Sequence, residues 1–206
     1  MPLERCLGQV IIGRWRNLAI VEIRWHARGG QGAVTAAKLL AEMALQQDLY
    51  FQAFPEYGPE RMGAPIQCFN RLSTEPINIY CSVDNPHLVV VVDPSLLGAV
   101  DFAAGLVPDG SVLVNTGEDL GHLQQRFDLA GRKVYAVNAS GISLETVGRA
   151  MPNTPILGAL VKILGLIPLE KAAAYLHDYF NEHFNADLAA KNVQAFERAY
   201  GEVRSA

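Results

Sequence analysis

The hydrophobic pattern near the start of the chain changes from the period of a strand to the period of a helix. Residues 20–25 predict a strand, residues 28–32 a glycine-rich turn, and residues 33–46 a helix. Small apolar side chains share one face of that helix and would let it pack closely on a sheet: Ala33, Ala36, Ala37, Leu40 and Ala44. Residues 49–54 predict a second strand, so the segment is typical of a βαβ unit.

Shorter apolar runs continue this alternation through the middle of the chain. Residues 65–72 and 77–80 predict two strands of an antiparallel hairpin, joined by a polar turn. Residues 88–92 are one Leu and four Val, which is typical of a central parallel strand buried on both faces. Residues 111–114 and 134–137 predict further strands, and each is followed by an asparagine.

The C-terminal third has the pattern of a helical region. Thr154 followed by Pro155 predicts an N-cap and a first helical residue, opening a buried helix over residues 155–164. A second helix is expected from Pro168, and a third over residues 187–200 that stops at Gly201. These elements predict an α/β fold: a three-layer αβα sandwich with a mostly parallel, Rossmann-like sheet, an antiparallel hairpin and a helical C-terminal third.

Length suits a single domain over residues 20–201, with an N-terminal arm or extension at 1–19 and a tail at 202–206. Half of the 206 residues are hydrophobic and 18% are charged, so the chain can bury a full core. A net charge of −4 without clustered basic residues argues against nucleic-acid binding. The longest apolar stretch is too short for a membrane span. Three widely spaced cysteines and no secretory pattern predict a cytoplasmic protein.

The glycine-rich turn is the first candidate site. Ala27, Gly29 and Gly32 fit the A-x-G-x-x-G form of the dinucleotide turn, between a strand and a helix. Asp48 and Glu56 are each poorly placed to hold a ribose, because neither stands at the end of the second strand. The turn could therefore bind NAD, pack the helix on the strand, hold another anion or phosphate, or serve as a backbone platform for a partner.

A proline-stiffened loop over residues 54–65 is the second candidate site. Arg61 could supply a guanidinium for a phosphate or carboxylate, or could form a solvated pair with Glu60. Tyr57 or Met62 could contact an apolar partner surface. The loop follows the second strand, so a parallel sheet would place it beside the glycine turn.

Two isolated polar residues have structural or functional interpretations. Asn192 is the one polar residue on an apolar face of the last helix, so its amide should bond a nearby loop or cross a subunit interface. His26 precedes the glycine turn, where a structural role is favoured. We find no catalytic motif, thiolate cluster or metal-ligand spacing, so no catalytic or metal-binding residue is predicted.

These residues carry a resemblance to the gamma subunit of 2-oxoacid:ferredoxin oxidoreductases. The resemblance covers residues 21–201 and is strongest in the segment 22–37 and the loop 54–65, whose form is similar to the pyruvate and branched-chain members. Further matching segments follow in the family's order: Val91–Leu97, Val114–Thr116, Asn153–Thr154, Leu157–Ala159, and Asn192 with Ala195, Phe196 and Tyr200.

The resemblance implies a complex that oxidatively decarboxylates a 2-oxoacid, usually to acyl-CoA and CO₂. Thiamine diphosphate, Mg²⁺ and [4Fe–4S] clusters would belong to partner alpha, beta and ferredoxin-like delta subunits, with ferredoxin or another acceptor taking the electrons. Gly29, Gly30, Gln31, Gly32 and Arg61 would then meet a coenzyme A phosphate or a neighbouring subunit. Tyr57, Glu60, Met62 and Asn192 would be interface residues. A stand-alone NAD(P)-dependent oxidoreductase and a purely structural scaffold subunit are the alternatives.

Overall fold

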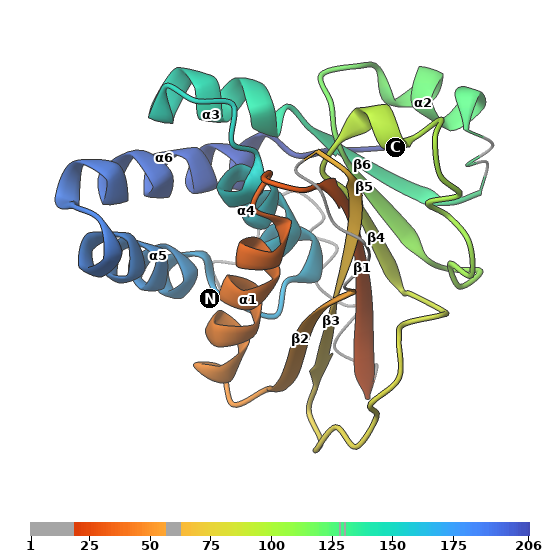
Figure 1. Cartoon of the computed structure of the whole chain (residues 1–206), viewed down its shortest axis with the longest axis horizontal. Helices are drawn as coiled ribbons and strands as arrows, with labels where there is room; N and C mark the ends of the chain where they lie inside the picture. Colours follow the sequence, from red (N-terminus) through yellow and green to blue (C-terminus); the bar gives the residue numbers. More distant parts are fainter. Residues whose placement is uncertain (1–18, 57–62, 128, 130) are drawn as a thin grey trace, which may run out of the picture.

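One mixed sheet forms the middle layer of the molecule (Figure 1). The computed structural model describes residues 19–56, 63–127, 129 and 131–206, and within them the strand order is β2–β3–β1–β4–β5–β6–β7. The strands are β1 (Ile20–Arg28), β2 (Tyr50–Glu56), β3 (Pro65–Ser73), β4 (Leu88–Val91), β5 (Ser111–Asn115), β6 (Lys133–Val137) and β7 (Arg204–Ser205). Only β3 and β7 run against the common direction, so the prediction of a mostly parallel sheet is confirmed.

The first βαβ unit differs from its prediction because β3 lies between β1 and β2. Both neighbours pair with β3 in antiparallel register, with Trp25 and Pro55 each opposite Cys68. The hairpin is therefore β2–β3, and the prediction that residues 65–72 pair with residues 77–80 is wrong. Residues 77–80 form no strand. The Arg71 guanidinium donates to the Ile79 and Cys81 carbonyls, so the side chain of Arg71 holds this segment in place of backbone hydrogen bonds to a neighbouring strand.

In the described part of the chain, five helices cover one face of the sheet: α1 (Ala33–Leu45), α3 (Ala139–Val147), α4 (Asn153–Leu164), α5 (Leu169–His183) and α6 (Ala186–Glu202) (Figure 1). The small apolar face of α1 packs on the sheet as predicted, since all five of its predicted residues are buried. Helix α4 is buried all round and contacts α1, α3 and α6, which explains its nearly uniform apolar sequence.

A thinner layer covers the opposite face of the sheet. It contains the 3₁₀ turn η2 (Pro94–Leu96), the segment that follows it, and α2 (Leu120–Arg126). Leu97, Phe102 and Leu123 pack there on alternate residues of β4, β5 and β6. Because both coverings bury its side chains, β4 is fully buried and central, as its Leu-Val sequence predicts.

Two helix boundaries and the tail differ from the prediction in the C-terminal third. Helix α4 begins at Asn153 after Pro152, so Thr154 lies inside the first turn and the prediction that it is the N-cap is wrong. Helix α6 passes through Gly201 and ends at Glu202. The predicted tail then adds a short strand, because Arg204 and Ser205 pair with β6.

Candidate functional site

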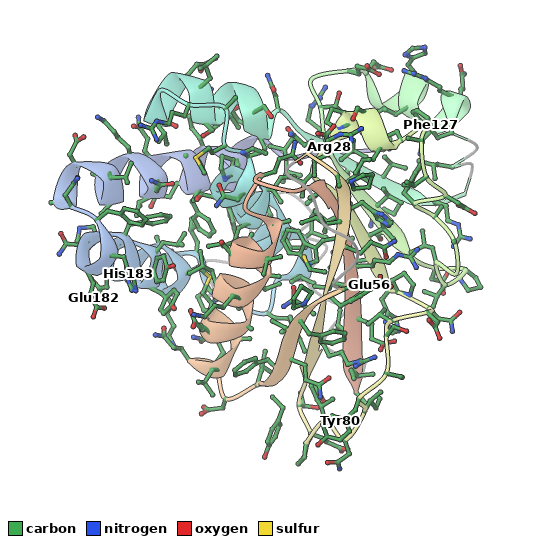
Figure 2. All side chains as sticks on the ribbon, in the orientation of Figure 1. Arg28, Glu56, Tyr80, Phe127, Glu182 and His183 are labelled. Atoms are coloured by element: carbon green, nitrogen blue, oxygen red, sulfur yellow. The ribbon has the colours of Figure 1, made fainter. Side chains whose placement is uncertain are left out.

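Four parallel strands, β1, β4, β5 and β6, end along the same edge of the sheet. The chain leaves β1 towards the helical layer through α1, whereas the segment after β4 packs on the opposite face (Figure 1). This reversal makes the edge between β1 and β4 a topological switch point, which is where open α/β sheets bind ligands. The glycine-rich turn lies at that edge, and Figure 2 shows Arg28 there.

The backbone of the glycine-rich turn depends on two glycines. Gly30 and Gly32 have φ angles of 96° and 76°, in the left-handed region that disfavours other residues. Gly32 precedes α1, and no side chain among the described residues caps the helix, so the first amides of α1 have no side-chain acceptor there. A Cβ on Gly32 would lie 2.8 Å from Asn153 Nδ2, which shows that the start of α4 packs directly on the turn.

Gln31 uses its side chain to hold the turn rather than to face outward. Its Oε1 accepts a hydrogen bond from the Arg28 backbone at 2.8 Å, and its Nε2 donates to Asp93 Oδ2 at 2.6 Å. The Gly29 amide is also engaged, because it donates to the Ala64 carbonyl at 2.9 Å. A ligand here would therefore meet the backbone of Gly30 and Gly32 and the first turn of α1.

Asp93 links the end of β4 to the glycine-rich turn. Besides Gln31, its carboxylate accepts from the Ser95 amide at 2.9 Å and lies 3.5 Å from Arg28 Nε. Partial burial raises the pKa of Asp93, but the hydrogen bonds from Ser95 and Gln31 and the charge of Arg28 outweigh it and lower that pKa. The carboxylate is therefore ionised at neutral pH.

Arg28 joins three chain segments at this edge. Its guanidinium donates to Ser95 Oγ at 2.9 and 3.1 Å and to the Gly63 carbonyl at 3.1 Å. Gly63 also donates to the Gly29 carbonyl at 3.2 Å, so the end of the proline-stiffened loop lies beside the glycine-rich turn. The prediction that these two segments are neighbours is confirmed at Gly63 and Ala64. Tyr57, Glu60, Arg61 and Met62 lie outside the described residues.

Polar residues at the ends of β5 and β6 hold the rest of the edge together. Asn115 donates to the Val92 carbonyl and to Ser140 Oγ, both at 2.8 Å, and its Oδ1 accepts from the Ser140 amide. Asn138 caps α3 by accepting from the Gly141 amide. Sequence reasoning did not select these residues, or Asp93, as site residues. Their common signal is an Asp or Asn at the end of a parallel strand or within two residues after it.

His26 lies beneath the edge, on the face of the sheet opposite α1. It is 3% exposed, and its Nε2 has no hydrogen-bond partner among the described residues. Burial, followed by the charge of Arg24, lowers the pKa of His26 to about 4. The side chain is therefore neutral at pH 7. Its burial supports a structural role, although its ring is not fully satisfied.

Among the described residues, Asn192 bonds the backbone of its own helix rather than a loop. Its Nδ2 donates to the Leu188 carbonyl one turn earlier in α6 at 2.9 Å, and the residue is 7% exposed. Among the described residues no loop partner is found, because the amide nitrogen donates to the backbone of its own helix.

Metal-ligating side chains do not gather in the described part of the chain. There, no group of three or more His, Cys, Asp or Glu could hold a metal ion. Cys68 is buried, and this burial raises the pKa of its thiol to about 12, whereas Cys81 is exposed. Within the same residues, no helix is long and apolar enough to cross a membrane.

The fold and this edge define an α/β domain that presents backbone amides at a topological switch point. Comparison with known proteins gives its family. The chain belongs to the family described as pyruvate ferredoxin/flavodoxin oxidoreductase, whose model matches residues 22–202. The resemblance found in the sequence is thereby confirmed.

Relatives of similar length support the same assignment. The chain is 44% identical to pyruvate synthase subunit PorC of Thermotoga maritima, over 89% of this chain and 94% of that protein. It is 42% identical to the pyruvate/ketoisovalerate oxidoreductases common subunit gamma of Pyrococcus furiosus, over 88% and 96% respectively. This chain is therefore a gamma-type subunit of the family, and such a subunit implies partner subunits.

Solved structures share the fold. The crystal structure of pyruvate oxidoreductase subunit PORC from Thermotoga maritima matches with a TM-score of 0.81 and 41% identity, covering 92% of this chain and 99% of that one. A 2-oxoglutarate:ferredoxin oxidoreductase from Magnetococcus marinus, with 2-oxoglutarate, coenzyme A and succinyl-CoA bound, matches with a TM-score of 0.72. At 18% identity over 31% of that chain, the second likeness concerns the fold alone.

Proposed function

We propose that this gamma subunit works in a cytoplasmic, thiamine-diphosphate-dependent complex that oxidatively decarboxylates a 2-oxoacid to an acyl-CoA and CO₂. Pyruvate is the substrate that the names of its relatives favour. Alpha and beta subunits would hold thiamine diphosphate and Mg²⁺, and a ferredoxin-like delta subunit would hold [4Fe–4S] clusters. The described residues of this chain offer no ligand group that fits those metals. Electrons would pass to ferredoxin or another acceptor.

This chain would contribute assembly contacts and the coenzyme A side of the site. The observation that carries this proposal is the uncapped N-terminus of α1 at the switch point, behind a turn that needs glycine at positions 30 and 32. Coenzyme A carries phosphate groups, and helix N-terminal amides bind phosphate through their N–H groups and the helix dipole. Arg61 would add a guanidinium from the adjacent loop. Gln31 and the Gly29 amide would support this set indirectly, since both are engaged within the protein.

Interface roles are proposed for the remaining residues of the loop. Tyr57 and Met62 would pack on an apolar surface of a partner subunit, and Glu60 would pair with a cation there. Asn192 would lie at an interface with a partner subunit, while its amide nitrogen stays bonded to the Leu188 carbonyl.

The geometry argues against the NAD(P) alternative. A dinucleotide site needs a carboxylate at the end of the strand that follows α1 in the chain and pairs directly with β1. Glu56 is the last residue of β2, whereas the sequence placed it beyond that strand. Because β3 lies between β1 and β2, Glu56 is displaced from β1 by a further strand spacing of about 4.8 Å. Asp48 precedes β2 and stands at the opposite end of the sheet. Micromolar binding of NADH to the full chain would favour this alternative.

The proposed function is tested with Arg61→Ala in the assembled complex. Losing one charge-assisted phosphate contact should raise the KM for coenzyme A about tenfold or more, with kcat and the KM for pyruvate unchanged. The matched control is Arg126→Ala, because Arg126 is an exposed arginine on α2, on the opposite face of the sheet from α1. Steady-state ferredoxin reduction at varied coenzyme A measures both constants.

An unchanged KM for coenzyme A in the Arg61→Ala complex would contradict the coenzyme A role. If that complex also assembles normally and retains full turnover, the scaffold interpretation is favoured. Affinity purification from the native cell, with mass spectrometry of the companion chains, tests the partner subunits separately.

A further inference from the structure

Asp93 stands where the glycine-rich turn and the end of β4 meet, and sequence reasoning gave it no role in the site. We propose that Asp93 is a positioning residue: it holds the glycine-rich turn so that the first amides of α1 face the coenzyme A phosphates. This inference rests on the proposed function for the identity of the ligand. The positioning of the turn itself can be measured without that ligand.

The two carboxylate oxygens of Asp93 have separate tasks. Oδ1 accepts from the Ser95 amide and thereby caps η2, on the β4 side of the switch point. Oδ2 accepts from Gln31 Nε2 at 2.6 Å and lies 3.5 Å from Arg28 Nε, on the β1 side. One carboxylate therefore connects two strands whose chains leave towards opposite faces of the sheet.

Gln31 transmits this connection into the backbone of the turn. Its Oε1 accepts from the Arg28 amide while its Nε2 is held by Asp93, so the side chain spans the turn from one end to the other. The other hydrogen bond within the turn joins the Gln31 amide to the Arg28 carbonyl at 3.1 Å. Gly30, which has a positive φ, lies between these fixed points and Gly32 follows them directly, and glycine does not by itself restrict the backbone. Asp93 therefore supplies order that the glycines do not.

The charge of Asp93 suits a supporting role and does not suit a ligand contact. A carboxylate repels phosphate, so Asp93 would oppose binding if its charge were uncompensated. Here Arg28 lies beside it, and its two oxygens face protein donors. The carboxylate is 14% exposed, which keeps these bonds largely shielded from water.

Asp93→Asn separates the two tasks of the side chain. Its remaining oxygen can still cap η2, because asparagine is a good N-cap residue. The new NH₂ group would face Gln31 Nε2 and Arg28 Nε, which are both donors, so the link to the turn is lost. Asp119→Asn is the matched control: Asp119 also follows a parallel strand and caps a helix through one oxygen, which accepts from the Gly121 and His122 amides.

Two measurements on the assembled complex test the proposal. In Asp93→Asn, the KM for coenzyme A should rise about tenfold, the ratio that corresponds to one charge-assisted hydrogen bond of roughly 1.4 kcal/mol, while kcat and the KM for pyruvate stay unchanged. Without coenzyme A, amides of residues 29–34 should exchange with deuterium about tenfold faster. Asp119→Asn should change neither quantity. Gln31→Leu should reproduce both effects, and the double variant should add little to either single variant.

Each contrary result has a definite meaning. Unchanged deuterium exchange in the turn, or an unchanged KM for coenzyme A, in Asp93→Asn overturns the positioning role. If Arg61→Ala raises the KM for coenzyme A in the same assay, the proposed function survives that failure. If neither variant changes the KM, the proposed coenzyme A site is itself wrong, and the positioning role fails with it.

Discussion

Replacing Gly158 with alanine should destabilise the contact between α4 and α6, where the two helix backbones approach closely. An ideal Cβ on Gly158 would lie 2.1 Å from the Phe196 carbonyl oxygen and 2.9 Å from its carbon. Real Cβ contacts essentially never fall below 3.0 Å, so something must move. The obstructing atoms are helix backbone rather than the end of a flexible side chain. The two helices must therefore separate.

The loss of stability follows from packing and helix propensity. Separation would open a tightly buried contact, since Leu157, Ala159 and Phe196 are all fully buried. Overpacking of this kind costs about 3 kcal/mol when the backbone cannot relax. Alanine returns about 1 kcal/mol through its higher helix propensity. The net loss is therefore about 2 kcal/mol, which lowers the melting temperature by roughly 4–8 °C in a chain of this length.

Urea unfolding of the full chain, followed by far-ultraviolet circular dichroism, measures this loss. Gly201→Ala is the matched control, because Gly201 lies in α6 and a Cβ there meets no atom within 4 Å. That variant should be unchanged or gain up to about 1 kcal/mol. If Gly158→Ala is as stable as the control, the reasoning about close helix approach is refuted.

Two further predictions concern buried polar groups. The folded-state pKa of His26 is about 4 against an ordinary 6.5, so its contribution is present above pH 6.5 and is lost as the pH falls towards 4. His26→Gln should therefore remove up to about 3 kcal/mol of the decline in unfolding free energy between pH 7 and 4, and identical urea titrations of both chains across that range would disprove this. Thr154→Val should be neutral or stabilising by up to about 1 kcal/mol, because the buried Thr154 Oγ1 has no partner among the described residues. If thermal unfolding instead shows that Thr154→Val lowers the stability by about 1 kcal/mol, Thr154 does act as a helix cap.

Periodicity located most of the secondary structure because each element carries its own local signal. The Leu-Val sequence of β4 reports burial on both faces, and the alanine face of α1 reports close packing. Strand pairing carries no comparable local signal. The partner of β3 depends on which chain segment can reach it, so the predicted hairpin with residues 77–80 was wrong while the strand itself was right.

The candidate site was only partly visible in the sequence. Spacing located the glycine-rich turn, but it could not show that the Gly29 amide and both ends of Gln31 are engaged within the protein. Asp93 stands 62 positions after Gln31, and no local pattern connects them. The resemblance to the family came from exact residue order and therefore needed no three-dimensional information.

The amino-acid sequence by itself determined most of the elements, the family and the position of the turn, because these depend on neighbours along the chain. The tertiary structure alone decided that β3 lies between β1 and β2, that Asp93 contacts Gln31 and Arg28, and that a side chain at Gly158 would clash with α6. These features join residues that are distant in sequence. Hydrogen-bond geometry and van der Waals contact act through space over a few ångströms, so they appear only when the folded chain brings such residues together.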